Sequence, residues 1–505
     1  MTTMTDSAAS TWPPKDTFSI IVLFAALSVV YYVGSKIYDV YFGPLSEFPG
    51  PKLSAFSVLP SLSSLFTGDD AVYVPELHAK YGPVVRTSPD HLSFANGAAG
   101  FKEIYGFGKK GLYKDPQFYG VPLNKVHSII TADDANHSRQ RKILSHAFSD
   151  RALKDQEPLL KRWVELMRDK LLESAEAGKP ADMLKFYNCT TFDIMGDLTF
   201  AESLQMLEGS DYSPWVKVIF AGVKTGTRLR AFKIYSKITN YLVENLLFKS
   251  EVVRKKQWEH WNYSKERVDR RLARTPDRPD LWTKILERGS GPDGLSVPEH
   301  HSIASLFMIA GTETTATALS GTTYQLLTNP DTLALLQKEI RTAFSSFDDM
   351  GLESLAKQKY LMAVLQEGLR MYPPVPSELP RVVPAGGAVI CGQWVPGGTK
   401  VGVHHLATYR NEELFRKPYE FHPERWLGDP EFKDDKLDAM EAFSVGPRNC
   451  LGKNLAWHEM RLLMATVVLH FDMKLCEESK GWNDQKVFTL WEKKPLMATL
   501  TPAKA

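Results

Sequence analysis

The ten residues Phe443-Ser-Val-Gly446-Pro447-Arg448-Asn-Cys450-Leu-Gly452 decide how this 505-residue chain is interpreted. Gly446 and Gly452 carry no side chain, so the backbone near Cys450 can lie close to a flat macrocycle. An apolar-rich segment, Leu455 to Phe471, follows and is expected to form a helix. The positive end of that helix would favour the thiolate form of the cysteine. A thiolate ligand of haem iron needs these features, whereas a cysteine without them is usually buried and inert.

The run resembles the haem-binding loop of the cytochrome P450 family, F-x-x-G-x-R-x-C-x-G, at every fixed position. This resemblance implies haem b as the cofactor, with Cys450 as the axial ligand of its iron. It also implies that Phe443 packs on the sulfur side of the ring and that Arg448 pairs with a haem propionate. The longer sequence from Gly446 to Ala456 is most similar to that of filamentous-fungal enzymes of secondary metabolism, among them the trichothecene hydroxylases.

The longest predicted helix carries a second motif. It is expected to run from Ser296 to Thr328, with a capping box formed by Ser296 and Glu299 at its start. Asn329-Pro330 ends it. Its small and apolar residues predict a buried path through most of the protein, and the run Ala310-Gly-Thr-Glu-Thr-Thr315 lies near its middle.

Glu313 and Thr314 in that run are the candidate catalytic residues. Glycine beside a cluster of threonines weakens a helix, and a buried carboxylate is costly unless it is paired or hydrated. The run is therefore interpreted as a local opening that admits oxygen rather than as packing. It is similar to the family's A-G-x-[DE]-T-[TS] motif, which makes Glu313 the acid and Thr314 the alcohol that deliver protons.

Two further motifs predict a buried ionic cluster. Glu367 and Arg370 share one face of the predicted helix Tyr360 to Met371, and Arg425 follows in the segment Phe421-His-Pro-Glu-Arg425-Trp426. In the family, an E-x-x-R pair closes a triad with the arginine of a P-E-R segment. One carboxylate between two guanidiniums satisfies many donors, so the triad is expected to support the cysteine loop without taking part in catalysis.

The family resemblance also assigns cations to the two haem propionates. It points to Arg141, to Arg381 and to Arg448. The family often has tryptophan four residues before the first of these arginines, where this chain has His137. An imidazole can still donate to a propionate, so His137 is included among the cofactor-binding residues.

The four motifs occur in family order, and the resemblance covers the chain from about Leu45 to its end. The implied fold class is mainly α, a cytochrome P450-like helical fold with a minor β-sheet. Strand-like pieces bounded by Gly and Pro agree with a small sheet. They are Val84 to Arg86, His91 to Phe94, Ala388 to Ile390 and Lys400 to Val403.

One N-terminal transmembrane helix is expected in addition, because residues 18–34 are almost wholly apolar and long enough to cross a bilayer. A cleaved signal peptide is the alternative, but its apolar region is shorter and a small-residue cleavage site follows it. The predicted division is a lumenal segment (1–17), the anchor (18–36), a proline-rich hinge (37–52) and a haem-thiolate catalytic domain (53–505). Four scattered cysteines and the cofactor chemistry favour a cytosolic catalytic domain on the endoplasmic reticulum membrane.

Together these features predict a haem-thiolate monooxygenase that inserts one oxygen atom from O2 into a lipophilic small molecule. The implied electron donor is NADPH-cytochrome P450 reductase, which would dock on a basic face. The net charge of +2 gives no reason to expect nucleic acid as a partner. The alternatives are a haem-thiolate isomerase or dehydratase that acts without O2, and a haem-binding protein without turnover. Residues assigned to the docking face are Arg139, Lys142, Arg448 and Lys453.

The resemblance places the substrate pocket in three apolar and aromatic stretches: Tyr105 to Val126, Leu204 to Phe232 and Phe488 to Trp491. By family analogy, the segment that carries Glu378 passes beside this pocket. Similar fungal sequences usually have glycine at this position. Its expected partner is Arg381 or another arginine, with outward exposure or recognition of a basic or hydroxyl-bearing substrate as alternatives. His404-His405 lacks a third metal ligand nearby in the sequence and is expected to be structural.

Overall fold

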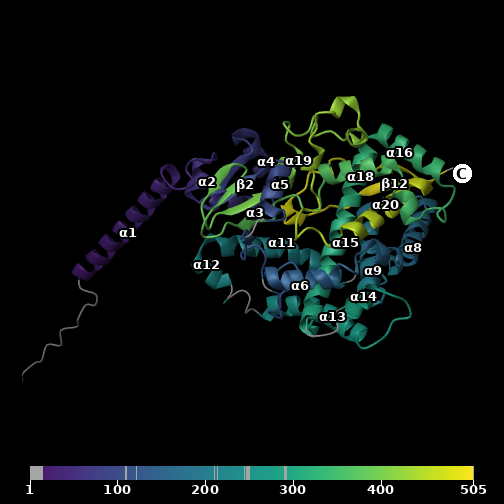
Figure 1. Ribbon diagram of the computed structural model, residues 1–505, viewed down its shortest axis with the longest axis horizontal. Helices are drawn as coiled ribbons and strands as arrows, with labels where there is room; N and C mark the ends of the chain where they lie inside the picture. Colours follow the sequence, from purple (N-terminus) through teal and green to yellow (C-terminus); the bar gives the residue numbers. More distant parts are fainter. Residues whose placement is uncertain are drawn as a thin grey trace, which may run out of the picture.

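One helix, α15 (Val297–Thr328), runs through the centre of the body, and the other long helices pack around it (Figure 1). Its partners are α9 (Met183–Phe200), α13 (Glu251–Leu272), α18 (Lys359–Met371) and α20 (Lys453–His470). The predicted start of α15 is confirmed, because the backbone N–H of Ser296 donates to the Glu299 carboxylate at 2.8 Å. Its predicted end at Thr328 is confirmed as well.

The computed structural model of the chain describes residues 15–108, 111–120, 122–209, 211–212, 214–243, 245, 251–288 and 293–503. Most of the predicted lumenal segment therefore lies outside the described residues. The remaining described helices surround the central five and are short or peripheral. They are α2 (Lys52–Phe56), α3 (Leu59–Thr67), α4 (Asp70–Tyr81), α5 (Ala98–Tyr105), α6 (Asp134–Leu144), α7 (Asp150–Lys154), α8 (Glu157–Glu176), α10 (Met206–Gly209), α11 (Pro214–Tyr235), α12 (Lys237–Leu242), α14 (Leu281–Arg288), α16 (Pro330–Ala343), α17 (Leu352–Leu355), α19 (His405–Tyr409) and the 3-10 turns Pro423–Leu427, Pro430–Phe432, Leu437–Ala439 and Glu477–Ser479.

Three of the four predicted strand pieces lie in a five-stranded sheet beside the helices, in the order β1-β2-β8-β5-β3, whereas the fourth, Ala388 to Ile390, lies in a separate hairpin. Strands β2 and β8 are parallel, and the other neighbours are antiparallel. Leu92, Phe94, Val401 and Val403 are buried beneath this sheet in a core separate from the main helical core. The strands of this sheet are β1 (Val84–Ser88), β2 (His91–Phe94), β3 (Tyr113–Lys114), β5 (Arg381–Val382) and β8 (Lys400–Val403).

Three smaller sheets complete the strand structure. One has the order β4-β12-β9, and the other two are the hairpins β6-β7 and β10-β11. The β10-β11 hairpin carries the predicted pocket stretch that begins at Phe488. Their strands are β4 (Ala181–Asp182), β6 (Ala388–Ile390), β7 (Gln393–Val395), β9 (Phe471–Leu475), β10 (Val487–Phe488), β11 (Leu490–Trp491) and β12 (Met497–Pro502).

The N-terminal helix α1 (Lys15–Tyr41) projects away from the body, and its apolar side chains are exposed along most of its length (Figure 1). The stretch from Thr17 to Tyr41 is long and apolar enough to cross a membrane. The helix continues past the predicted anchor boundary at residue 36, because its last turns pack on the body. There Val40 is buried, and Arg86 donates to the carbonyl oxygen of Asp39 at 3.4 Å.

The central run of α15 is helical throughout, so the predicted weakening does not break the helix. The hydroxyls of Thr312, Thr314 and Thr317 each donate at 2.6 Å to the carbonyl oxygen four residues earlier, within the same helix. Admission of oxygen at this run stays a prediction. A β-carbon on Gly311 would lie 2.7 Å from the sulfur of Met195 in α9. Glycine at this position thus allows α15 to pack closely against α9, and a larger residue would require the Met195 side chain to move.

The predicted triad of Glu367, Arg370 and Arg425 is confirmed, and all three side chains are fully buried. The Glu367 carboxylate accepts from Arg370 at 2.7 and 2.9 Å and from Arg425 at 3.0 Å. Trp426 donates to it at 2.9 Å. Burial alone would raise the pKa of Glu367, but the two guanidiniums hold it below its ordinary value. The triad ties α18 to the segment that leads into the cysteine loop.

Replacing Glu367 by Gln should destabilise the protein by about 3–5 kcal/mol, because the buried Arg370 loses its counter-charge and Arg425 keeps only its pair with Asp435. The measurement is denaturant unfolding of the detergent-solubilised holoprotein. Glu431→Gln is the matched control, because Glu431 pairs with Lys417 at 2.7 Å on the protein surface. Equal losses of stability in the two variants would contradict the structural role of the triad.

Candidate functional site

The segment that carries Cys450 forms a tight loop immediately before α20. The backbone N–H of Cys450 donates to the carbonyl oxygen of Phe443 at 2.9 Å, and that of Asn449 donates to Gly446 at 3.2 Å. Gly446 has a φ of 77°, and a β-carbon there would overlap the carbonyl oxygen of Tyr105. The loop thus closes only because position 446 has no side chain. Helix α20 begins at Lys453, so the helix predicted after the cysteine is confirmed.

Phe443 lies beside the start of α20. Its ring centroid is 5.8 Å from the Trp457 ring, and the Lys453 ammonium lies 5.8 Å from the Phe443 centroid. The ring is therefore anchored to the helix that follows the cysteine. This position is compatible with its predicted place on the sulfur side of a macrocycle.

The protonation of Cys450 is controlled by opposing effects. Although the Cys450 side chain is exposed, desolvation by the surrounding protein raises the pKa of its thiol above the ordinary value, whereas the backbone N–H of Gly452 and the Arg141 guanidinium act to lower it. The start of the helix therefore does not make the thiolate the favoured form by itself. A coordinated metal ion deprotonates a thiol outright.

Arg141, on α6, holds the cysteine loop from the other side. Its two terminal nitrogens donate at 2.6 Å to the backbone and side-chain oxygens of Asn449, directly beside Cys450. These contacts orient the loop. Binding of a propionate by Arg141 stays a prediction.

The other predicted propionate ligands bring positive charge together near this loop. Arg448 donates at 2.8 Å to the exposed Asp134, while its second terminal nitrogen is buried without a hydrogen bond among the described residues. Arg381 is buried on β5, where it donates to the Tyr119 hydroxyl at 3.2 Å. His137 is buried on α6. Burial, followed by Arg448 and other cations, lowers the pKa of His137 to about 4.

Lys114 belongs to the same group, although the sequence analysis missed it. It lies on β3 directly opposite Arg381 on β5. Burial, together with the nearby charges of Arg381 and Arg448, lowers its pKa to about 6. No sequence pattern distinguishes it from Lys109, Lys110 and Lys125, which lie in the same predicted pocket stretch.

This donor set fits haem. The backbone at Gly446 leaves room for close approach, Cys450 supplies a sulfur ligand, and the convergent basic side chains repel one another in the absence of anions. Two propionate carboxylates would relieve that repulsion and would supply an acceptor for the unpartnered nitrogen of Arg448. The residues present therefore match both the metal and the acidic edge of the cofactor.

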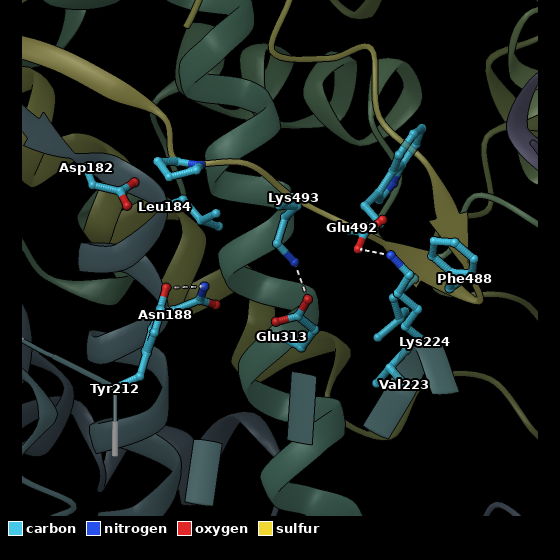
Figure 2. A pocket seen from close by; sticks show the side chains of 13 residues that line it. Asp182, Leu184, Asn188, Tyr212, Val223, Lys224, Glu313, Phe488, Glu492 and Lys493 are labelled. Atoms are coloured by element: carbon cyan, nitrogen blue, oxygen red, sulfur yellow. Dashed lines mark hydrogen bonds and ion pairs between the residues drawn. The ribbon is translucent and has the colours of Figure 1, made fainter. Parts of the chain in front are cut away.

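Glu313 is buried and pairs with the ammonium group of Lys493, as Figure 2 shows. Lys493 also donates to the Thr317 hydroxyl at 2.7 Å. The pair lines a cavity of about 360 Å³ between α9, α11, α15 and the segment after β10, with Tyr212 and Lys224 among its other lining residues. Lys493 was not predicted from the sequence, because it lies 180 residues from Glu313 along the chain and no local pattern links the two.

Thr314 faces a different direction from its neighbour Glu313. It is partly exposed, as is Gly311, and Ala310 is exposed, although α15 is buried along most of its length. The Thr314 hydroxyl donates to the Ala310 carbonyl oxygen, and no hydrogen bond between Thr314 and Glu313 is found within the described residues. The predicted acid–alcohol pair is therefore adjacent in the chain but not directly bonded.

Glu459 is a buried carboxyl group that the sequence analysis also missed. It lies on α20, next to Thr315 of α15, and burial raises its pKa to about 8. It is therefore mostly protonated at neutral pH. The pair connects the helix that follows Cys450 with the helix that carries Thr314.

The three predicted pocket stretches meet in a second cavity, of about 100 Å³, which receives Phe118, Arg230 and Thr489 from them. The predicted pocket stretches are apolar and aromatic, but charged side chains also line this cavity. Its lining includes eight ionisable side chains: Asp70, Asp90, His91, Asp115, Arg230, Glu378, Lys400 and His404.

Glu378 pairs with His91, so the expectation of an arginine partner is wrong. Their nearest side-chain atoms are 2.7 Å apart, and both side chains are largely buried. Burial alone would lower the pKa of His91, but the Glu378 carboxylate raises it above its ordinary value. Arg381 instead lies at the Tyr119 hydroxyl.

His404 and His405 both have structural contacts. His404 caps α19 by accepting from the backbone N–H of Ala407 at 3.2 Å. The His405 ring stacks on Phe101 at 5.4 Å.

Replacing Gly446 by Ala should abolish haem incorporation, because the new methyl group would overlap the Tyr105 carbonyl oxygen. The reduced carbon monoxide spectrum measures the incorporated haem. Gly428→Ala is the matched control: Gly428 has a φ of 80°, but a β-carbon there meets no atom within 4 Å. Normal haem content in the Gly446 variant would contradict the proposed loop constraint.

The Glu378–His91 pair should stabilise the protein more at low pH than at high pH. Because the pair raises the folded-state pKa of His91, its contribution is complete below the ordinary histidine pKa and is lost as pH rises through the raised value. The loss of stability caused by Glu378→Gln should therefore be larger at about pH 6 than at about pH 9 in denaturant unfolding. Glu420→Gln, which disrupts an exposed pair with His422, is the control. A pH-independent difference would contradict the ionic character of the buried pair.

The family model for cytochrome P450 matches residues 49–499 of the chain. The cytochrome P450 monooxygenase efuB of Hormonema carpetanum is 50% identical over 95% of each chain. The cytochrome P450 monooxygenase lcsI of Purpureocillium lilacinum is 41% identical, over 95% of this chain and 93% of the relative. The cytochrome P450 monooxygenase FUM2 of Gibberella moniliformis is 40% identical, over 93% of this chain and 100% of the relative.

The family-model match and the similar proteins agree with the observed fold, with the cysteine loop and with the haem-thiolate chemistry that the loop implies. The chain is therefore an enzyme of the cytochrome P450 family, a haem-thiolate monooxygenase.

Proposed function

We propose that this enzyme inserts one oxygen atom from O2 into a lipophilic small molecule, by hydroxylation or epoxidation, in fungal secondary-metabolite biosynthesis. The observation that carries the proposal is the open face of α15 at Ala310 and Thr314, beside the buried Glu313–Lys493 pair. An exposed alcohol next to a buried acid suits proton delivery to bound oxygen, which an isomerase or dehydratase does not need.

Haem, held by Cys450, supplies the activation of molecular oxygen when it is bound. Arg448, Arg381, Arg141 and His137 would hold its propionates, and Phe443 would pack against it. The three predicted pocket stretches would contact the substrate.

The chain's own residues would move the protons. The Thr314 hydroxyl, which donates to the Ala310 carbonyl oxygen, must rotate to donate toward the oxygen site. Lys493 holds the Glu313 side chain in its cavity through their ion pair, so that Glu313 is positioned between the cavity and the middle of α15. Lys493 is thus a positioning residue.

The proposed location is the endoplasmic reticulum membrane, with α1 as a single-pass anchor and the catalytic domain in the cytosol. Exposed apolar side chains of the body support a second membrane contact on the side from which α1 projects (Figure 1). They lie on α2, α3, α4, α11 and α12: Leu53, Leu59, Phe66, Val72, Phe232, Tyr235, Ile238, Tyr241 and Leu242.

The proposed electron donor is NADPH-cytochrome P450 reductase, which presents acidic groups to a basic face. Within the predicted face, Lys142 and Lys453 are exposed. Arg139 is paired with Glu299, and Arg448 is paired with Asp134. The two lysines are therefore the stronger candidates for contact with the donor.

Thr314→Ala should keep NADPH consumption but release peroxide in place of product, because oxygen no longer receives its protons from the alcohol. Haem content should be unchanged, and the measurement compares NADPH, O2, peroxide and product. Thr328→Ala is the matched control, since its hydroxyl also bonds back to its own helix, at 3.0 Å from the Tyr324 carbonyl oxygen. Substrate turnover without NADPH-dependent O2 uptake would overturn the proposed function in favour of an isomerase or dehydratase.

A further inference from the structure

Two cations face each other on a short strand pair of the five-stranded sheet. Strands β3 and β5 are each two residues long, and their register places Lys114 directly opposite Arg381. Like charges at opposite positions of an antiparallel pair destabilise the pairing. The Tyr119 ring centroid lies 4.2 Å from the Lys114 ammonium and 5.9 Å from the Arg381 guanidinium. An aromatic face attracts cations but carries no net charge, so the repulsion between the two strands is not cancelled.

Lys114 also lies close to the cysteine loop. Its ammonium donates at 2.6 Å to the carbonyl oxygen of Ile130, and Arg448 donates at 2.8 Å to the carbonyl oxygen of Ala132. Residues two apart in a chain lie within about 7 Å of each other. Because Arg448 is two residues before Cys450, Lys114 and the cysteine loop meet on the same short segment before α6.

The acidic side chains nearest to this cluster are placed elsewhere. Asp134 pairs with Arg448, but its side chain is 86% exposed, so the pair is weak. Asp115 follows Lys114 in the chain and lies 4.0 Å from Lys400. Among the described residues, no carboxylate lies within ion-pairing distance of either cation of the strand pair.

The cations of this cluster keep hydrogen-bond donors for an anion. Lys114 uses one of its three N–H donors on Ile130. Within the described residues, Arg381 donates through one terminal nitrogen only, to the Tyr119 hydroxyl at 3.2 Å and to carbonyl oxygens of its own segment at 3.4 Å. One terminal nitrogen of Arg448 is buried without a partner in the same residues. Burial and the two like charges lower the pKa of Lys114 to about 6, and an anion beside the ammonium would act in the opposite direction.

We propose that Lys114 binds a haem propionate, together with Arg381 and Arg448, and so ties the β3–β5 strand pair to the cofactor. A carboxylate at the face shared by the two strands replaces their repulsion by charge-assisted hydrogen bonds to both. Because β3 lies within the predicted pocket stretch Tyr105 to Val126, the haem would also hold this stretch in place. This role of Lys114 depends on the cofactor alone, whichever substrate the enzyme oxidises.

The test compares Lys114→Met, which keeps a side chain of similar length without its charge, with Lys114→Arg, which keeps the charge. Each full-length holoenzyme is purified in detergent without substrate, and haem loss is followed as transfer to excess apomyoglobin. Lys114→Met should lose haem about tenfold faster than wild type, as expected for the loss of one charge-assisted hydrogen bond. Lys114→Arg should stay within about threefold of wild type.

Resonance Raman spectroscopy of the same holoenzymes gives a readout that a purely structural role of Lys114 would not change. The bending vibration of a haem propionate rises in frequency when the carboxylate accepts stronger hydrogen bonds. This band should move to lower frequency in Lys114→Met and return toward its wild-type position in Lys114→Arg. Because substrate is absent, an anionic substrate cannot cause the change.

Lys102→Met is the matched control, because Lys102 is an exposed lysine of α5, the helix that contacts the cysteine loop through Tyr105. Its haem loss and its propionate band should equal those of wild type. Unchanged haem loss in Lys114→Met would overturn the proposal. Faster haem loss with an unchanged propionate band would overturn it as well, because Lys114 would then act only through its contact with Ile130.

Discussion

The cysteine loop can close only because Gly446 leaves room for the carbonyl oxygen of Tyr105. That contact joins the loop to α5, which packs against β8 of the five-stranded sheet. Arg141 fixes the opposite side of the loop through Asn449, and α20 begins three residues after Cys450. The sulfur is thus held between the sheet region and the helical core. Every other part of the site, from the propionate cations to α15, is placed relative to this loop.

The structural features that sequence patterns predicted correctly are mostly those that local backbone geometry controls. The capping box of Ser296, the helix after Cys450 and the strand pieces follow from short-range rules of helix capping and side-chain alternation. The triad of Glu367, Arg370 and Arg425 was predicted from the order of its motifs along the chain, and its burial is confirmed. These features depend on residues close in sequence or on a motif order that the family shares.

Contacts between distant segments could not be predicted in the same way. Lys493 reaches Glu313 across 180 residues, and Lys114 meets Arg381 only because β3 and β5 pair. Gly311 was interpreted as a weak point in the helix, but its packing partner Met195 was not visible in the sequence. In each case a local signal existed, and its meaning depended on a partner that tertiary structure supplies.

The most direct test of the account is the reduced carbon monoxide spectrum of four cysteine variants. Cys450→Ala should lose the red-shifted Soret band of a thiolate complex, because Cys450 is the cysteine in the loop that Gly446 and Arg141 fix. Alanine at Cys189, Cys391 or Cys476 should leave that band intact. A thiolate band in the Cys450 variant would contradict the assignment of the iron ligand and, with it, the arrangement of the whole site.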